Sequence, residues 1–380
     1  MNAKTDDRLF AGVDLGAGAG AKIGVFDAAL NRMNSGFVSV AGYGSDGDIL
    51  ATVLANEILR LQRADGVGRR TLAAVGVAAP GLFRSDGSFL KIHNLPFLDD
   101  VNLPRLIGAR LDMPVAGLND ADAGGLAEWT LIRKPLLYWA LGGGWGGAWV
   151  DRGGHVLFPA VDWDGRDASL HPTNEPGYSI PLDKNDLDGL FKAKGASFSR
   201  FEAVCASCCP SVSLAGPDGR ADCVRAELLV SGPGRWRIFR MLAARDASWQ
   251  KEINPGEVKA LNAPETAGGV MDGLSRLRVP IAVKTDMLFA EAMALAARFL
   301  FERARRDGCP ADIPLIFGGK PSRAFPFFHD ELRKGLLAQG VRSRLTLSRL
   351  EQQGKNANML GAAALARREA GGRPGAGHSV

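Results

Sequence analysis

The apolar residues near the start of the chain form two short runs, residues 9–13 and 22–26, separated by alternating glycine and alanine. This pattern predicts a strand, a glycine-rich loop and a second strand. Apolar residues then recur at helical spacing over residues 49–63, and residues 72–77 form a run of small and apolar residues. We therefore expect a helix followed by a buried strand.

A second strand–glycine–strand pattern appears further along the chain. Residues 113–118 predict a strand, and residues 120–129 predict a helix of small residues. Residues 136–141 then predict a strand, residues 142–147 a glycine loop, and residues 148–150 a further strand. Because the chain repeats its opening pattern, we predict two related lobes.

The remainder of the chain carries fewer clear patterns, and its periodicity is weak between residues 182 and 278. Helices are predicted at residues 187–194, 236–245, 287–306 and 358–368, and a strand at residues 313–317. The glycine- and proline-rich residues 371–380 predict a disordered tail.

The composition is that of a globular protein. With 380 residues, 46% of them hydrophobic, the chain can bury large cores in more than one domain. The first residues lack the pattern of a secretory signal, and glycines or charges interrupt the most apolar stretches, so we expect a cytoplasmic protein without a membrane partner. The net charge of +5 permits binding of anions such as nucleotides and does not require nucleic acid.

The five cysteines are an odd number, which argues against a disulfide framework and favours a reducing compartment. Cys205, Cys208 and Cys209 lie close together, with Cys223 as the nearest fourth candidate for a zinc site. Two adjacent cysteines rarely both face one ion. We therefore interpret them as unligated thiols in or beside a helix, with a metal site as the alternative.

Asp14 follows the first predicted strand and precedes a loop that contains Gly16, Gly18 and Gly20, with Lys22 after it. Glycine allows backbone N–H groups to approach a phosphate closely. The alternative is an ordinary hairpin in which the glycines only form the turn. A strand rather than a helix follows the lysine, which excludes both a P-loop and a dinucleotide-binding fingerprint.

Gly142, Gly143 and Gly144 begin the second glycine loop, and Gly318 with Gly319 follows the strand predicted at residues 313–317. Either the glycine pair or one loop alone is a weak signal of function, because glycines also serve turns. Two glycine loops in one chain favour a nucleotide clamped between two lobes.

Asn119 and Asp120 stand between a predicted strand and a predicted helix. An Asp in that place is often only a helix cap. It could instead take the proton from a hydroxyl that attacks a phosphate, with the neighbouring Asn fixing that hydroxyl. Asp122, two residues on, leaves open which carboxylate faces the site.

Taken in order, these motifs resemble those of the ROK family, which comprises repressors, uncharacterised reading frames and sugar kinases. The resembling segments are residues 14–16, 75–81, 93–96, 119–128, 142–147, 318–319 and 360–363. The resemblance implies an α/β, two-lobed actin-like ATPase fold, a duplicated ribonuclease H-like architecture with an interlobe cleft. Its N-terminal lobe would cover residues 8–121, with a C-terminal helix at 346–368 returning to it, and the larger C-terminal lobe residues 122–345.

The resemblance also implies an ATP-dependent carbohydrate kinase that uses Mg²⁺ and forms a homodimer. Asp120 would be the catalytic base, and Asp14 would lie near magnesium and the phosphates. The implied substrate-binding residues are Gly81, Asn94, Asn119, Glu175 and Tyr178. The implied ATP- and phosphate-binding residues are Asp14, Gly16, Gly18, Gly20, Lys22, Gly142, Gly143, Gly144, Gly318 and Gly319.

The chain also departs from the ROK pattern. Tyr178 stands where the family has the His of its Glu-x-Gly-His motif, the zinc-binding cysteine motif is absent, and the first glycine loop is longer. No DNA-binding helix-turn-helix precedes the first strand, which argues against the repressor branch. We expect a sugar-like substrate other than plain glucose, such as a cyclitol, an amino sugar or a modified hexose, and no bound zinc. A non-catalytic sugar or nucleotide sensor is the alternative, against which Asn119, Asp120 and Glu175 argue.

Overall fold

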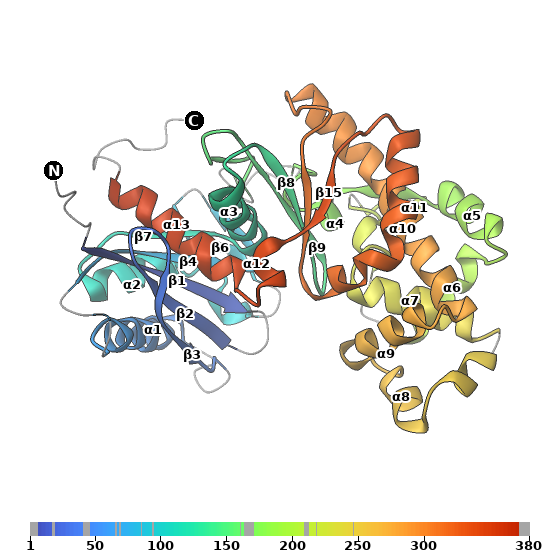
Figure 1. The fold of residues 1–380 in the computed structure, drawn as a ribbon, viewed down its shortest axis with the longest axis horizontal. Helices are drawn as coiled ribbons and strands as arrows, with labels where there is room; N and C mark the ends of the chain where they lie inside the picture. The colour runs from blue at the N-terminus through green and yellow to red at the C-terminus, as the bar shows by residue number, and fades with distance from the viewer. Residues whose placement is uncertain are drawn as a thin grey trace. The chain divides into compact units, whose positions relative to one another are not determined.

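The computed structural model describes residues 7–16, 20–40, 46–64, 67, 70–84, 86–92, 95–159, 161–162, 171–208, 213–217, 219–245 and 247–371. The chain divides into two compact units (Figure 1). The first unit comprises Met1–Leu136, Ala148–Ser169 and Arg349–Val380. The second comprises Leu137–Gly147 and Leu170–Ser348.

The first unit is built on a five-stranded mixed sheet with the order β3-β2-β1-β4-β7. Its strands are β1 (Arg8–Gly16), β2 (Gly20–Phe26), β3 (Arg32–Val38), β4 (Thr71–Ala79) and β7 (Val115–Asn119). β1 pairs antiparallel with β2 and parallel with β4, which in turn pairs parallel with β7. Helices α1 (Gly47–Gln62) and α2 (Leu103–Leu111) pack against this sheet, as do α3 (Asp120–Ile132) and α13 (Ala357–Gly371).

The two faces of this sheet differ in side-chain size because alternate residues of a strand point to opposite faces. Leu9, Ala11, Val13 and Leu15 belong to the large core that includes the apolar face of α1. The intervening residues face α13, where the side chains are small. A Cβ at Gly12 would overlap the backbone of α13, so glycine is what allows the helix to lie directly on β1.

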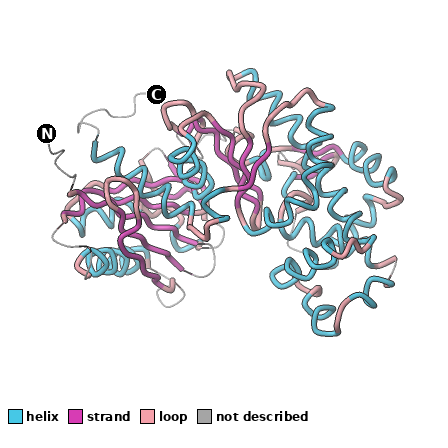
Figure 2. Tube along the Cα trace, viewed as in Figure 1, coloured by secondary structure: helices cyan, strands magenta, loops and turns pink. Residues whose placement is uncertain are grey.

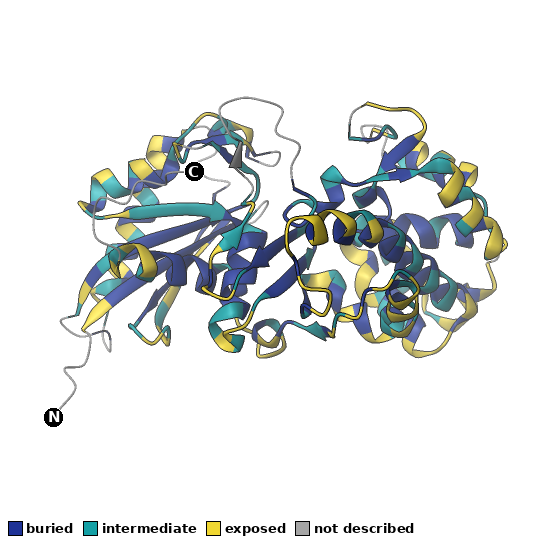
Figure 3. Cartoon of the chain, turned by 90° about the horizontal axis from the view of Figure 1, so that it is seen from above, coloured by how far each residue is buried: buried dark blue, intermediate teal, exposed yellow. Residues whose placement is uncertain are grey.

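The second sheet also has five strands, in the order β10-β9-β8-β14-β15. These strands are β8 (Leu136–Leu141), β9 (Trp145–Val150), β10 (Val156–Leu157), β14 (Leu315–Gly318) and β15 (Leu345–Leu347). β8, β14 and β15 are parallel, whereas β10 runs antiparallel to β9. Strands β8 and β14 are almost wholly buried, and Figure 3 colours buried residues of strands and helices dark blue.

Helices make up most of the rest of the second unit (Figure 2). They are α4 (Pro176–Ser179), α5 (Lys184–Ala193), α6 (Phe198–Cys208), α7 (Gly232–Ala243), α8 (Pro255–Ala260), α9 (Pro264–Arg276), α10 (Pro280–Arg306) and α11 (Phe325–Ala338). Arg235 of α7 ties three of them together, because its buried guanidinium binds Asp272 of α9 and Asp286 of α10.

Shorter elements complete the chain. They are β5 (Leu82–Arg84), β6 (Phe89–Lys91), β11 (Val161–Asp162), β12 (Pro181–Asp183), β13 (Cys223–Arg225), α12 (Arg349–Gln352), and the 3₁₀ helices η1 (Pro96–Leu98), η2 (Ala226–Leu228), η3 (Ser248–Glu252) and η4 (Lys320–Ala324). No helix among the described residues combines the length and apolar character that a membrane crossing requires.

The strands and helices predicted from the apolar pattern are confirmed to within a few residues, apart from the differences given next. The single C-terminal helix that the resemblance implied at residues 346–368 is instead two helices, α12 and α13, after the end of β15. α10 begins at Pro280 rather than at residue 287, because Pro supplies a helix start that the apolar stripe does not reveal. Gly146 and Gly147 lie in β9, so the second glycine loop is shorter than predicted. α3 belongs to the first unit, beyond the boundary predicted after residue 121, because it packs along α13. Of the predicted disordered tail, Gly371 ends α13 and the other residues lie outside the described range.

Candidate functional site

Asp14 lies towards the carboxyl end of β1, and its buried carboxylate accepts hydrogen bonds on both oxygens. Asn356 Nδ2 donates to Asp14 Oδ2 at 2.6 Å, and Asn358 Nδ2 donates to Oδ1 at 3.2 Å. Lys22 is paired with Asp14 across the β1–β2 hairpin, and its Nζ lies 3.7 Å from Oδ2. Two amides and one ammonium group thus hold the charge of this carboxylate in place.

The orientation of Asn356 is fixed by the helix that follows it. Its Oδ1 accepts a hydrogen bond from the Met359 N–H at 2.9 Å, which is the arrangement of a helix N-cap at the start of α13. Because the oxygen of the carboxamide is engaged in this way, its NH₂ group faces Asp14. The cap of α13 and the position of the Asp14 carboxylate therefore depend on one side chain.

Asn119 and Asp120 lie where β7 ends and α3 begins. Asn119 Oδ1 accepts a hydrogen bond from the Ala121 N–H at 2.8 Å, and its Nδ2 donates to the Gly81 carbonyl at 2.9 Å. Asp120 Oδ1 accepts from the same Ala121 N–H at 2.8 Å. The parallel register of β1, β4 and β7 brings Asp14 and Asp120 to one edge of the sheet.

The electrostatic environment of Asp120 is unusual for an aspartate. Burial raises the pKa of Asp120 to about 6, and the negative charge of Asp14 raises this pKa as well. A carboxylate with such a pKa is ionised at neutral pH and still binds a proton more strongly than a free Asp does. These are the properties of a general base that works near neutrality.

Glycines shape the backbone around these side chains. Gly81 follows β4 with a φ of 130°, and a Cβ there would overlap the Lys91 carbonyl. Gly16 is the last residue of β1, and Gly20 is the first residue of β2 and has a φ of 132°. Gly18 and Asn94, which the sequence also predicts as site residues, lie outside the described residues.

The second unit holds the other predicted glycines. Gly142, Gly143 and Gly144 join β8 to β9 in a turn closed by a hydrogen bond from the Gly142 N–H to the Gly144 carbonyl. A Cβ on Gly142 or Gly143 would meet no atom within 4 Å, so packing does not require glycine at these two positions. At Gly319, in contrast, φ is 85° and a Cβ would overlap the Leu141 carbonyl. Of these two glycine segments, the turn at residues 142–144 therefore has open space beside its backbone, and the one at Gly319 does not.

Glu175 and Tyr178 also belong to the second unit. Glu175 is the N-cap residue of α4, and Tyr178 lies within the single turn of this helix. Both side chains are half-buried. The Tyr178 ring lies against the guanidinium of Arg225, whose Cζ is 4.0 Å from the ring centre. This cation–π contact fixes the phenol on one of its faces.

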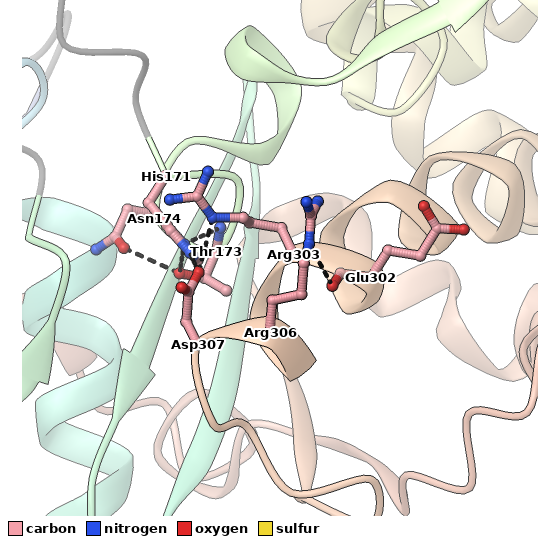
Figure 4. Close-up of polar contacts among 7 residues, drawn as sticks. All are labelled: His171, Thr173, Asn174, Glu302, Arg303, Arg306 and Asp307. Carbon is pink, nitrogen blue, oxygen red and sulfur yellow. Dashed lines mark hydrogen bonds and ion pairs between the residues drawn. The ribbon is translucent and has the colours of Figure 1, made fainter.

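A buried histidine anchors the segment that precedes Glu175 (Figure 4). His171 Nε2 lies 2.9 Å from Asp307 Oδ2, and the Thr173 N–H donates to His171 Nδ1 at 3.3 Å. Burial lowers the pKa of His171 even though Asp307 opposes this shift. A neutral imidazole that donates from Nε2 satisfies both contacts. Arg303 Nε donates to the same Asp307 oxygen at 2.7 Å, so the end of α10 holds this segment in place.

The described residues contain no group of three or more His, Cys, Asp or Glu side chains that could hold a metal ion. Cys205 and Cys223 are buried, and Cys209 lies outside the described residues. The absence of zinc stays a prediction. Magnesium makes smaller demands, since one or two carboxylates with phosphates and water suffice. Asp14, towards the carboxyl end of β1, fits that requirement.

No family model matches the chain, and no curated protein matches it either. A ROK hexokinase from Thermus thermophilus has a similar structure, with a TM-score of 0.62, 21% identity, and coverage of 95% of this chain and 98% of that one. A ROK glucokinase from Streptomyces griseus, solved with glucose and AMPPNP, has a TM-score of 0.61, 19% identity, and coverage of 95% and 99%. The chain has the ROK fold. A ROK transcriptional regulator, a homologue of the E. coli MLC protein, also shares it, with a TM-score of 0.70, 15% identity, and coverage of 97% and 80%.

The ROK fold confirms the predicted actin-like ATPase class and its mixed α/β architecture. Sequence reasoning missed Asn356 and Asn358, which contact Asp14, and His171 with Asp307, which anchor the segment before Glu175. One signal for Asn356 was available, since an Asn directly before an apolar helix is a common N-cap. The His171 contact carries no such signal.

Proposed function

We propose that the chain is an ATP-dependent phosphotransferase of the ROK family that phosphorylates a hydroxyl of a sugar or sugar-like polyol. The observation that carries this proposal is Asp120, a carboxylate at the start of α3 whose pKa of about 6 suits a general base. The ROK fold supports it, because two proteins that share the fold are named as a hexokinase and a glucokinase.

In the proposed reaction, Asp120 accepts the proton of the attacking hydroxyl, and Asn119 orients that hydroxyl. ATP would supply the phosphoryl group, with magnesium offsetting its negative charge. Asp14 is held rigidly by Asn356 and Lys22, so it can contribute a fixed negative charge to a magnesium site. Most of the rate enhancement would come from positioning and electrostatic stabilisation.

The glycine turn at residues 142–144 supports a phosphate-binding role in the second unit. A phosphate needs close approach to backbone N–H groups. The open space beside Gly142 and Gly143 leaves the backbone accessible, and neither packing nor a positive φ accounts for glycine there. Gly318 and Gly319 would contact the adenosine, and Glu175 the sugar, as the ROK pattern implies.

The test is an assay of ADP release over a panel of sugars, amino sugars and cyclitols, with the Asp120→Asn variant as the inactive control. We expect saturable turnover with at least one member of the panel that needs both ATP and magnesium. Absence of turnover with every member, together with tight binding of one of them, would instead support a sensor.

A non-catalytic sensor is the second candidate, because a transcriptional regulator shares the ROK fold over 97% of this chain. The altered first glycine loop also favours a sensor. Against it stands the presence of Asn119 and Asp120 at the junction of β7 and α3, together with Glu175, at the positions where the ROK pattern has its base and sugar-binding residues.

The substrate proposal rests on Tyr178, which stands in place of a histidine of the ROK motif. A phenol offers one hydroxyl, whereas an imidazole offers a donor and an acceptor. Because Arg225 covers one face of the ring, the phenol cannot turn freely. We therefore expect a ligand that differs from glucose near this residue. If glucose proves the best substrate and Tyr178→Phe leaves its kcat/KM unchanged, this part of the proposal is wrong. A second copy of the chain as partner stays a prediction.

A further inference from the structure

A cavity of about 410 Å³ opens in the first unit, and neither Asp14 nor Asp120 lines it. The turn after β2, the end of α3, and the segment between α12 and α13 form its walls. Its volume falls within the usual range for small-molecule sites, roughly 300–1,000 Å³. None of the predicted substrate or nucleotide residues that the structure describes lines it.

The charge of the cavity has one sign. Four basic side chains line it, Arg32, Arg133, Lys355 and Arg367, and among the described residues no Asp or Glu does. Asp27 and Glu351 each adjoin a lining residue in the sequence. Asp27 is engaged by its own turn, because it accepts hydrogen bonds from the Ala29 and Asn31 N–H groups.

Two of the guanidinium groups are close enough to repel each other. Burial lowers the pKa of Arg367, and the positive charge of Arg133 lowers it as well. Arg367 Nη1 donates to the Ala28 carbonyl at 2.9 Å, and the Arg133 guanidinium lies 4.5 Å from the centre of the Trp129 ring. The two guanidinium groups are therefore held in place, although the positive charge of each is unfavourable for the other. An anion between them would relieve that repulsion.

Apolar side chains complete the lining, among them Phe26, Leu131 and Met359. Leu131 is 45% exposed, so part of the apolar lining is open to solvent. A simple inorganic ion would leave this surface in water. A ligand with an apolar body and one anionic group would cover both the apolar wall and the arginines.

We propose that this cavity is a binding site for a small organic phosphate, a monoester whose body is apolar. The planar guanidinium groups match the oxygens of a phosphate, and the apolar wall matches the body of the ester. The alternative is that the arginines form an ordinary solvated surface. Such a surface would bind neither phosphate nor ester with a defined stoichiometry.

The position of the cavity gives the site a route to Asp14. Asn356 lines the cavity and also donates to the Asp14 carboxylate. A ligand that shifts Asn356 would therefore change the environment of Asp14. Binding itself needs no turnover, so the site can be tested whether or not the chain is a kinase.

The experiment is calorimetric titration of the full chain with phenyl phosphate, with inorganic phosphate and phenol as separate probes. We expect one saturable site for phenyl phosphate, weaker binding of inorganic phosphate, and none of phenol. Affinity should fall as salt rises. With a saturating concentration of AMPPNP, phenyl phosphate should still bind at one site, although its affinity can change through the shared contact at Asn356. Competition between the two would place the ester at the nucleotide site and overturn the proposal.

Variants locate the site. Arg133→Gln and Arg367→Gln should each weaken phenyl phosphate binding about tenfold or more, which corresponds to about 1.4 kcal/mol. The control is Arg276→Gln, which removes the charge of an exposed arginine on α9 and should change affinity little. Arg367 also donates a hydrogen bond to the Ala28 carbonyl, so Arg367→Gln can destabilise the fold. In that case Arg367→Lys, which keeps the positive charge and loses the planar guanidinium, replaces it in the titration. Absence of saturable binding, or equal loss in all the Gln variants, would overturn the proposal.

Discussion

Replacing Asp120 by Asn removes the charge of the proposed base and keeps the shape of the side chain. The Asn oxygen can still accept the hydrogen bond from the Ala121 N–H that Asp120 accepts in the native chain. Turnover should fall by roughly 10² to 10⁴, because an Asn side chain cannot accept the proton of the attacking hydroxyl. Binding of the sugar should survive. The kcat/KM of the native chain should rise with pH through about 6, where Asp120 loses its proton.

The same substitution should make the chain more stable at neutral pH. The pKa of Asp120 is raised from 3.8 to about 6, so the folded chain binds this proton more strongly than the unfolded chain does. The free energy of unfolding of the native chain therefore falls as pH rises from about 4 to about 6. The Asp120→Asn variant has no titrating group at this position and does not lose this stability. About two pKa units correspond to at most about 3 kcal/mol. Partial solvent exposure and the favourable field of the α3 N-terminus reduce the expected gain to about 1–2 kcal/mol at pH 7.5.

Urea unfolding at pH 4 and at pH 7.5 measures this effect. Asp120→Asn and the native chain should have nearly the same unfolding free energy at pH 4, and the variant should be the more stable at pH 7.5. Asp183→Asn is the matched control, since Asp183 is also a half-buried Asp at a helix start and Asn caps a helix equally well. Near-normal turnover of Asp120→Asn would move suspicion to Asp122. A variant that is less stable at pH 7.5 would refute the electrostatic reasoning.

Three further predictions follow from the packing, the cap and the cysteines. Gly361→Ala should destabilise the chain by about 1–3 kcal/mol because its Cβ would overlap α3, whereas Gly268→Ala, in open space on α9, should stabilise it by up to about 1 kcal/mol in the same urea assay. Asn356→Ser keeps a side chain that can cap α13 and removes the amide donor to Asp14, so turnover should fall with little loss of stability; equal losses in Asn356→Ser and Asn356→Ala would argue that only the cap matters. Elemental analysis should find no stoichiometric zinc, and one zinc per chain that disappears in Cys205→Ser would contradict this.

Most of the sheet strands could be predicted from the sequence because their signals are local. The apolar run of β1, the small residues of β4 and the glycines between strands all act within a few residues. The same holds for the start of α3, where Asn119 is both a strand end and a cap. Asp120 could therefore be placed correctly at the junction, although its pKa could not, since burial and Asp14 determine it.

The helices of the second unit were harder to predict because their apolar stripes are short or interrupted. Proline marks their starts instead: α8, α9 and α10 each begin at a Pro, and a capping box of Asn254 and Glu257 precedes α8. Side-chain contacts between residues far apart in the chain could not be predicted from local sequence patterns. Asn356 and Asp14, or His171 and Asp307, meet only because the fold brings them together.

The position of α13 has a consequence for how the protein is made. This helix follows every other described element in the chain, yet it covers one face of the first sheet and supplies both amides that bind Asp14. During synthesis, the face of the first sheet that includes Gly12 and Gly76 stays exposed to solvent until α13 has left the ribosome. Premature termination a few codons before α13 should therefore yield a chain that chaperones retain and proteases degrade, even though most of its residues have been translated.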